Sequence, residues 1–543
     1  MFNDDARVDS TMSSPAPSVD KRDSLHTAGS VFFVSAAGRV LKLPIPSRSH
    51  RDPLTWSSSK RFLALIALQF YSVVTSFEIN APGLIVAGLQ HEFTQDDMNP
   101  FNLRSMSSAM TLFTGIGYLI AIPMSTAVGR RPVLVGASVV TVLSTFWAGH
   151  IESYLELLAS FAFQALAAGA SISMCVLILM DATFIHERPT ALSLFWCIGA
   201  VFIKISLMLV SLTIDLNNNW RSLYNVWSIP CLASSIMVLV CVPETYFLRP
   251  PVALDGRVIV QSSSEKVQVY GGWDEVENIR MDRPLPDVPS SWSFWSHFKL
   301  ERAPGAKCGS MLTTYGQMLL CILNPLTFWV SLLAGVILSG VILLSLTQPA
   351  VLIKHQSPRT VEVLFGVSGI VGAILAFPFT GPFATCFTRY YSFRKGGIRH
   401  AEVYLFLFAV PVFCALVSVL VNGLAIMNNW PLACLYITSA LSMMSYLTGN
   451  VAIILWITEA FPRWAAAALG VQLFIANMVS FGIGTAITSW TEARQILQPT
   501  ILISALILLT GALAVPMAFW GKNVRQYIEG RWSDSERSAL RPQ

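Results

Sequence analysis

The sequence predicts an all-α membrane protein in which twelve transmembrane helices form two six-helix pseudo-repeats. One observation is a set of long apolar stretches, each close to the roughly 20 residues that a membrane-spanning helix needs. Another is a polar insert that separates them into two blocks of six, the layout of carriers built from two repeats. The stretches lie near 63–88, 105–127, 132–150, 156–180, 190–212 and 222–242, and then near 324–350, 361–384, 402–425, 431–458, 465–488 and 497–520.

Composition is a third observation. The chain has 543 residues, of which 54% are hydrophobic and 12% are charged. Soluble proteins carry about 25% charged residues, so this chain has too few charges to coat the surfaces of several soluble domains. The composition therefore excludes a soluble protein.

The spans divide the chain into tails, halves and a linker. We expect the N-terminal tail to be largely disordered. The linker is too polar to span a membrane, and its aromatic run Trp292–Phe298 is predicted to form a short amphipathic helix at the membrane surface. The parts are an N-terminal tail (1–60), an N-terminal six-helix half (61–242), a linker (243–323), a C-terminal six-helix half (324–520) and a C-terminal tail (521–543).

Basic residues in the short loops predict the orientation, because Lys and Arg favour the cytoplasmic side. One side collects pairs such as Lys60–Arg61, Arg130–Arg131 and Arg394–Lys395, while the loops 89–103 and 426–430 on the other side contain neither Lys nor Arg. Both termini and the linker are therefore predicted to be cytoplasmic. The net charge of +5 belongs to this inner belt, so we expect no nucleic-acid partner.

The sequence lacks the residue patterns that several kinds of chemistry require. The nine cysteines stand singly, without CxxC or Cys/His ligand spacing, so neither a metal site nor a disulfide framework is expected. The sequence contains no Gly-Lys-Ser/Thr loop of the kind that holds the phosphates of ATP. The spans also offer no His cluster, no pair of catalytic carboxylates and no Ser–His arrangement. We therefore expect no enzyme activity and no cofactor.

Short motifs recur at the ends of the spans. Gly129-Arg130-Arg131-Pro132 occupies the tight turn between spans two and three, where Gly allows a sharp reversal and Arg can bind helix ends. Taken together, the motifs and their placement resemble the major facilitator superfamily, and specifically its fungal twelve-helix group of drug–proton antiporters. The resemblance runs from about Gly38 to Trp520. The other motifs are Asp52–Ser57, Asp181–Arg188, Pro243–Tyr246, Gly396–Glu402 and Glu459–Arg463.

The chain departs from the family's pattern at several positions. Thr126 and Thr385 stand where the family has an acidic residue before the loop motif, which predicts a weaker inner charge lock. In the fourth span, Phe163 precedes Gln164 at the position where the family usually has an Arg. Gly199 is followed by Ala200, so the Gly-Pro pattern associated with antiporters is missing and the direction of transport stays open.

The resemblance implies the major facilitator fold, with spans one, four, seven and ten around a central cavity. It further implies a monomeric, multi-pass protein of the plasma membrane that moves a small organic molecule with protons. Export of a drug-like compound or secondary metabolite is the leading expectation. Proton-coupled uptake of a nutrient and a non-transporting sensor with the carrier fold are the alternatives.

Two charged residues lie well inside the spans. A charged side chain at a helix centre costs about 2.5–3.5 kcal/mol on insertion scales, so such residues usually face a cavity or a partner. Glu78 in span one and Lys204 in span five are our candidates for proton coupling, and one hypothesis pairs them. A static ion pair, or a lysine that reaches along the lipid to the membrane surface, is the alternative.

Polar and aromatic residues of the spans give further candidates. We expect a substrate cavity to draw on Tyr71, Asn80, Gln164, Trp329, Gln348, Asn450 and Trp456, although each could equally pack between helices. Charged residues and glycine at the inner helix ends are predicted to form a cytoplasmic gate or to anchor the loops. These are Gly129, Arg130, Arg131, Asp181, Arg188, Arg399, Glu402, Glu459 and Arg463.

Overall fold

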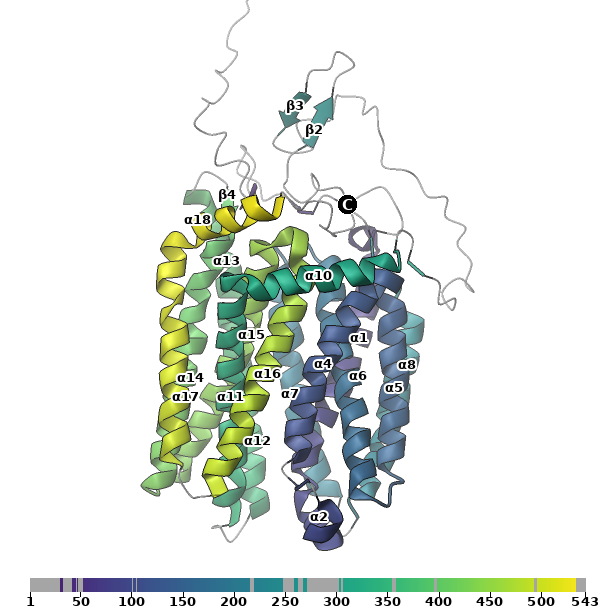
Figure 1. Ribbon diagram of the computed structural model, residues 1–543, viewed down its shortest axis with the longest axis vertical. Coiled ribbons are helices and arrows are strands. Elements are labelled where there is room, and N and C mark those ends of the chain that lie inside the picture. Colours follow the sequence, from purple (N-terminus) through teal and green to yellow (C-terminus); the bar gives the residue numbers. More distant parts are fainter. Residues whose placement is uncertain are drawn as a thin grey trace, which may run out of the picture.

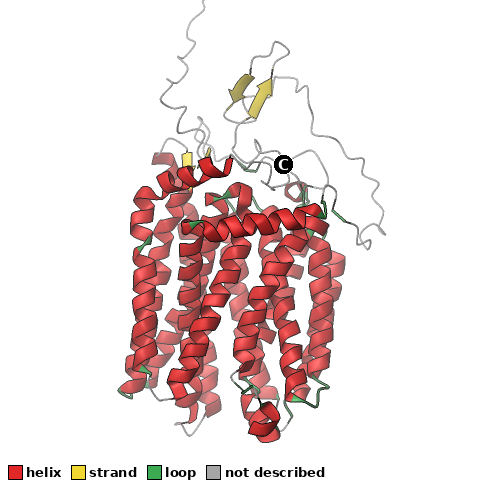
Figure 2. Ribbon diagram, viewed as in Figure 1, coloured by secondary structure: helices red, strands yellow, loops and turns green. Residues whose placement is uncertain are grey.

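The computed structural model is a bundle of long helices that run roughly parallel, with the strands and a crossing helix gathered at one end (Figures 1 and 2). We call this end the linker side and the other end the opposite side. The structure describes residues 30–32, 42–44, 46, 52–99, 101–103, 105–214, 219–247, 258–261, 267–270, 302–303, 306–353, 358–394, 398–492 and 496–533.

The N-terminal half contains six long helices and short pieces between the first two. The single turn η3 (Pro53–Thr55) precedes α1 and is capped by the buried Asp52, whose side chain accepts from Leu54 N. The elements are α1 (Ser58–Asn80), η4 (Ala81–Gly83), α2 (Val86–Glu92), α3 (Gln95–Met98), α4 (Ser105–Val128), α5 (Arg130–Ala148), α6 (Tyr154–Asp181), α7 (Arg188–Thr213) and α8 (Arg221–Cys241).

The C-terminal half repeats this plan with three interrupted spans. A π-helical turn breaks the second span, a 3-10 segment opens the third, and a bend divides the last. The elements are α11 (Pro325–Ile353), α12 (Pro358–Pro378), η7 (Phe379–Phe383), α13 (Ala384–Arg394), η8 (Ala401–Phe408), α14 (Ala409–Met427), α15 (Leu432–Ala460), η9 (Pro462–Trp464), α16 (Ala465–Glu492), α17 (Leu497–Ala512) and α18 (Ala514–Ser533).

The span count agrees with the prediction from the sequence. Within the described residues, eleven helices are long and apolar enough to cross a membrane. The bent pair Leu497–Ala512 and Ala514–Ile528, with a 40° angle, supplies a twelfth span. The structure is thus an all-α membrane protein with six spans before the linker and up to six after it.

The linker contains a helix that the sequence analysis missed. α10 (Gly309–Leu323) runs across the linker side of the bundle (Figure 1). Its 15 residues are too few to cross the membrane. It therefore packs along the bundle, against α4 of the N-terminal half and α16 of the C-terminal half. Thr314 of α10 lies 2.9 Å from Thr126 of α4, hydroxyl to hydroxyl.

Part of the N-terminal tail also takes up structure. The strand β1 (Ser30–Phe32) pairs antiparallel with β4 (Ile398–His400), which precedes the third span of the C-terminal half. The backbone N–H of Ile185, between α6 and α7, donates to the carbonyl of Leu43. The described tail residues thus contact both halves. The linker also contains the hairpin of β2 (Val258–Gln261) and β3 (Val267–Tyr270). The predicted helix Trp292–Phe298 lies outside the described residues.

The two halves meet mainly along two helix pairs, and α7 also contacts α15. α4 packs against α16, and α7 packs against α12. Glycine permits the first approach, because a Cβ on Gly115 of α4 would lie 2.6 Å from Met478 Cε and 3.1 Å from Asn477 Cβ of α16. These pairs place side chains from both halves near the middle of the bundle.

Candidate functional site

Glu78 is the most deeply buried acidic residue of the predicted site. It lies near the opposite-side end of α1 and is 0% exposed. Thr145 of α5 donates a hydrogen bond to Glu78 Oε1, and the Cys231 thiol of α8 lies 3.2 Å from the same oxygen. Glu78 Oε2 is buried without a hydrogen-bond partner in the described structure. The side chain therefore points into the interior of the N-terminal half.

The surroundings of Glu78 favour a neutral carboxylic acid. A buried carboxylate is very costly unless a cation or several donors compensate its charge. The described contacts of Glu78 are a hydroxyl and a thiol, neither of which carries a positive charge. A carboxylic acid in this position could release its proton only when the surrounding helices admit water or a cation.

Lys204 occupies a different environment, at the interface between the halves. Its side chain lies along α12, where a Cβ on Gly369 would be 3.2 Å from Lys204 Cε. The lipid-facing stripe of α7 consists of Leu194, Ile198, Phe202, Ile205, Leu209 and Leu212, all of which are exposed. With 3.6 residues per turn, Lys204 projects about 100° away from the centre of that stripe. This placement opposes the alternative of a lysine that reaches along the lipid.

Glu78 and Lys204 do not meet. Glu78 contacts α5 and α8 inside the N-terminal half, whereas Lys204 contacts α12 of the other half. The hypothesis of a Glu78–Lys204 pair is therefore wrong for this conformation. The sequence places both residues at a comparable depth, but it does not fix the direction in which each side chain leaves its helix.

The α7–α12 interface contains an acid that the sequence analysis missed. Glu362, near the start of α12, accepts a hydrogen bond of 3.1 Å from Ser211 of α7. Glu362 lies at the very edge of the predicted span 361–384, so its depth in the span did not mark it as a charged residue inside the membrane. At the linker side, Ser193 of α7 lies 2.5 Å from Thr380 of η7, hydroxyl to hydroxyl. Hydrogen bonds thus join the halves on both sides of Lys204.

A group of aromatic and amide side chains joins the halves at mid-depth, and we call it the central cluster. Trp196 of α7 packs edge to face on Tyr446 of α15, with ring centroids 6.2 Å apart. Tyr118 of α4 interacts with the side chain of Asn477 of α16. Asn450, one turn from Tyr446, donates to the Tyr446 carbonyl at 2.9 Å. The indole N–H of Trp196 is buried without a hydrogen-bond partner in the described structure.

Only Asn450 of the central cluster was among the predicted cavity residues. The signal for the others was present, because Tyr118, Trp196 and Tyr446 are polar-tipped aromatic residues in the middle of spans two, five and ten. Such side chains combine a large apolar face with one hydrogen-bonding group. They are abundant in any membrane bundle, so the sequence alone could not select these three.

Three of the predicted cavity residues each make their contacts within their own half. The Tyr71 hydroxyl lies 3.3 Å from that of Thr141, between α1 and α5. Gln164 of α6 is fully buried, with its Nε2 3.4 Å from the Ser144 carbonyl of α5. Trp329 of α11 donates to the Thr510 carbonyl of α17 at 2.8 Å. Their contacts match helix packing, the alternative that the sequence left open.

The other predicted cavity residues differ in position. Trp456 of α15 is 3% exposed and packs edge-on against Trp329 at 6.1 Å, and its indole N–H has no hydrogen-bond partner in the described structure. Asn80, at the end of α1, is exposed and donates to the Ser76 carbonyl. Gln348 belongs to α11, but its side chain lies outside the described part of the structure.

On the linker side of the N-terminal half, acidic groups bind the Gly-Arg-Arg turn. Gly129 has a φ of 117°, a conformation that glycine adopts readily. Glu244 accepts from the backbone N–H groups of Arg130 and Arg131 at 3.0 and 3.2 Å. The Arg130 side chain forms an ion pair with Asp181. Glu244 and Asp181 thus supply carboxylates to a turn that lacks the family's acid at Thr126.

The C-terminal half holds two further ion pairs on the same side. Arg399 and Glu459 are 2.6 Å apart, and Tyr404 donates to the other oxygen of Glu459 at 3.1 Å. Arg525 of α18 pairs with Glu402 of η8 at 2.8 Å. These ion pairs, like that of Arg130 and Asp181, lie within one half and stabilise the ends of its helices.

The remaining gate candidates lie close by. Arg188, at the start of α7, is buried and donates to the Met180 carbonyl at 3.3 Å. The side chain of Arg463 lies outside the described part of the structure. In the loop before α7, burial lowers the pKa of His186, the positive charges of Lys42 and Arg399 lower it further, and Glu187 opposes the shift. Charged groups of the tail and of both halves therefore lie near His186.

The described residues contain no group of three or more His, Cys, Asp or Glu side chains that could hold a metal ion.

Comparisons with known proteins agree with this architecture. An uncharacterized MFS-type transporter of Schizosaccharomyces pombe is 20% identical over 527 residues, which cover 90% of this chain and 89% of that protein. Citrate exporter 1 of Aspergillus niger is 27% identical over 249 residues, 44% of this chain and 43% of that protein.

A solved structure shares the fold. The proton:xylose symporter XylE, bound to 6-bromo-6-deoxy-D-glucose, superposes with a TM-score of 0.55 at 13% identity, covering 88% of this chain and all of that one. The family model of the Major Facilitator Superfamily matches residues 66–485. The chain therefore belongs to the major facilitator superfamily of transporters.

Proposed function

We propose that this transporter is a proton-coupled secondary carrier that exports a small organic molecule, a drug-like compound or a secondary metabolite, by alternating access. The observation that carries the proposal is Glu78, a fully buried carboxyl group whose contacts include no cation. In a bilayer-spanning bundle such a group is a natural proton carrier, because its neutral form is tolerated and its charged form requires a change of environment.

The helix contacts suggest how the proton and the substrate share one cycle. Thr145 of α5 and Cys231 of α8 contact Glu78 of α1, and α1 also packs against α7. Trp196 of α7 belongs to the central cluster. A change in the charge of Glu78 would shift α1, and α7 would pass that shift to the interface with the other half. In this proposal the central cluster forms the wall of the substrate site.

The proposal also covers the membrane, the orientation of the chain and its oligomeric state. Both termini and the linker lie in the cytoplasm, and the carrier works as a monomer in the plasma membrane. The basic residues on the linker side, among them Arg130, Arg131 and Arg399, support this orientation. The similarity to a citrate exporter over part of the chain supports export.

Transport by purified protein tests the proton coupling. Liposomes containing the protein are given an imposed pH gradient and are assayed with citrate and with the cationic dye ethidium. We expect the wild-type protein to concentrate a substrate against its gradient. Glu78→Gln should abolish this concentration while leaving equilibrium exchange, and Glu152→Gln, the same change at an exposed loop position, should change neither. A Glu78→Gln protein with unchanged pH dependence would remove Glu78 from the coupling role.

The direction needs a separate measurement. Cells with and without the gene are compared for the amount of compound that they retain. Export predicts less retention in cells that have the gene. Net uptake that collapses with the proton gradient would contradict export and support the alternative of a nutrient symporter.

Lys204 favours a second candidate function, the export of an organic anion. It places a cationic side chain at the interface between the halves, and the described structure gives it no ion pair. An anionic substrate would supply the missing charge. Lys204→Met should then lower citrate transport at least tenfold, and Lys204→Arg should retain part of it. Equal loss of ethidium and citrate transport in Lys204→Met would argue for a structural role instead.

A further inference from the structure

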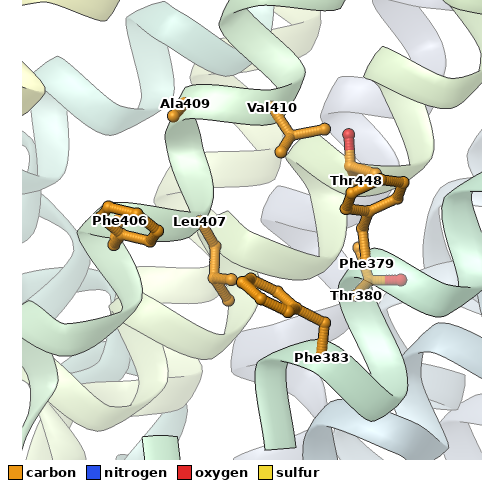
Figure 3. Close-up of a pocket in the computed structure, with 8 residues that line it drawn as sticks. All are labelled: Phe379, Thr380, Phe383, Phe406, Leu407, Ala409, Val410 and Thr448. Atoms are coloured by element: carbon orange, nitrogen blue, oxygen red, sulfur yellow. The ribbon is translucent and has the colours of Figure 1, made fainter. Parts of the chain in front are cut away.

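A cavity of about 220 Å³ lies in the C-terminal half, outside the central cluster (Figure 3). It is enclosed by η7, by the junction of η8 and α14, and by α15. Its lining consists of Phe379, Thr380, Phe383, Phe406, Leu407, Ala409, Val410 and Thr448.

The cavity opens toward the lipid. Phe379, Phe383 and Phe406 are 42%, 45% and 60% exposed, and all three belong to segments that cross the membrane, Thr360–Arg394 and Ala401–Met427. Figure 3 shows these rings together with Val410 and Thr448 among the side chains that line the cavity. Because 406–410 follow closely on the linker-side end of their span, the opening lies in the half of the bilayer nearest the linker.

The chemistry of the lining excludes most polar ligands. Only two side chains of the lining carry a polar group, and both hydroxyls already donate within their own helices. Thr380 donates to the Ala376 carbonyl at 3.0 Å, and Thr448 donates to the Met444 carbonyl at 2.7 Å. A polar solute would lose its hydration here without gaining a donor, whereas an alkyl chain would lose nothing.

The backbone explains why the cavity is not filled by the helices themselves. η7 is a π-helical turn that contains Pro382 and follows Pro378. Proline removes a backbone donor, and the wider π turn is often found at functional sites. Ala409, at the start of α14, presents only a methyl group to the cavity where a larger residue would close it.

We propose that this cavity binds the acyl chain of a phospholipid from the adjacent leaflet. With a volume of about 220 Å³, the cavity is large enough to hold a segment of several methylene groups. The chain enters between the exposed phenylalanines, and its headgroup stays at the membrane surface. The site is independent of the proposed proton coupling and of the direction of transport.

Occupancy of the cavity would also support the contact between the halves. Thr380 lines the cavity and lies 2.5 Å from Ser193 of α7. An acyl chain packed against η7 holds the π turn in the shape that presents Thr380 to Ser193. The lipid would therefore stabilise closure at the linker side.

Photolabelling of the full-length protein tests the site. The protein is placed in nanodiscs of palmitoyl-oleoyl phosphatidylcholine that contain a small fraction of the same lipid with a diazirine at the end of one acyl chain. After irradiation, labelled peptides are identified by mass spectrometry. We expect peptides with 379–383 and 406–410 to be labelled several-fold more than the peptide with Leu508 and Leu509, which are 56% and 65% exposed on α17.

Variants and a second lipid make the test decisive. Ala409→Phe should reduce the excess labelling to the level of the α17 peptide, and the matched change Ala233→Phe, at an exposed position on α8, should leave it intact. Val410→Phe serves the same purpose if Ala409→Phe does not fold. Uniform labelling of all lipid-facing helices in the wild type would overturn the proposal. So would equal labelling of the cavity by a lipid whose diazirine is on the headgroup.

Discussion

At the scale of single residues, the environment of Glu78 is the feature with the most consequences. Its carboxyl group contacts Thr145 and Cys231, and the neighbouring residue Phe77 stacks on Trp227 of α8 with ring centroids 3.6 Å apart. The hydroxyl of Tyr224 and the indole N–H of Trp227 are buried without hydrogen-bond partners in the described structure. A carboxyl group buried in these surroundings lowers the stability of the fold, which supports a functional reason for the presence of Glu78.

Removing the hydroxyl that binds Glu78 should destabilise the protein. A donor removed from a buried acceptor costs about 1–3 kcal/mol, because the acceptor stays desolvated. We therefore expect Thr145→Val to lower the Tm in detergent by several degrees. The matched change Thr213→Val, at an exposed position that donates to its own helix, should have little effect. An unchanged Tm for Thr145→Val would show that Glu78 does not depend on this bond.

His186 predicts a pH dependence at the linker side. Its pKa in the folded protein is lowered, chiefly by burial, relative to about 6.5 for a free histidine. The folded state therefore binds this proton less readily than the unfolded state does. The associated stability is fully present above about pH 6.5 and declines as the pH falls below it. Because the ring is partly exposed, the effect should be modest.

The measurement compares thermal unfolding at pH 7.5 and at pH 5.5. The Tm of the wild-type protein should fall on acidification, and His186→Gln, which cannot bind the proton, should show a smaller fall. An equal fall in both proteins would assign the acid sensitivity to other groups.

At the scale of elements, the sequence predicted the spans well and the interruptions of the C-terminal half poorly. About 20 apolar residues in a row specify a crossing, and the segments near 132–150 and 431–458 match α5 and α15 closely. The same apolar signal continues unchanged through η7, so the π turn at Phe379–Phe383 was not visible. α10 was missed because its apolar residues lie in a linker that is polar elsewhere.

Glycines at helix crossings give a prediction at this scale. A Cβ on Gly372 of α12 would lie 2.2 Å from the Ala440 carbonyl oxygen of α15, whereas a Cβ on Gly136 of α5 would meet nothing within 4 Å. Gly372→Ala must therefore push two helices apart, and overpacking of this kind costs about 1–3 kcal/mol. Gly136→Ala should be neutral or stabilising, since alanine favours helix by about 1 kcal/mol. Thermal unfolding of the two variants checks the contrast, and equal Tm values would contradict the close crossing.

At the scale of the whole molecule, the predicted site divides into two kinds of residue. Tyr71, Gln164 and Trp329 hold one half together, as do the linker-side ion pairs. Trp196, Lys204 and Asn450 belong to the elements at which the halves meet. The sequence could place these residues at a depth in the membrane, but not on a particular face of a helix. The direction in which a side chain points depends on how the twelve helices pack. That packing is set by contacts between residues that are far apart in the chain.

Alternating access makes a prediction about the two ends of the α7–α12 interface. Ser193 meets Thr380 on the linker side, and Ser211 meets Glu362 on the opposite side. If the halves rock as rigid bodies, each of these contacts must open once in every cycle. A covalent link at either end should therefore stop transport, although it joins residues far from the central cluster.

Paired cysteines in a background without the native cysteines test this prediction. Oxidation of Ser193→Cys with Thr380→Cys, or of Ser211→Cys with Glu362→Cys, should abolish transport, and reduction should restore it. The matched control is Ser138→Cys with Ser235→Cys, whose hydroxyls are 2.9 Å apart on α5 and α8 within one half. That link should leave transport intact, because the two helices move together. Continued transport by either linked interface pair would exclude rigid-body rocking of the halves about this interface.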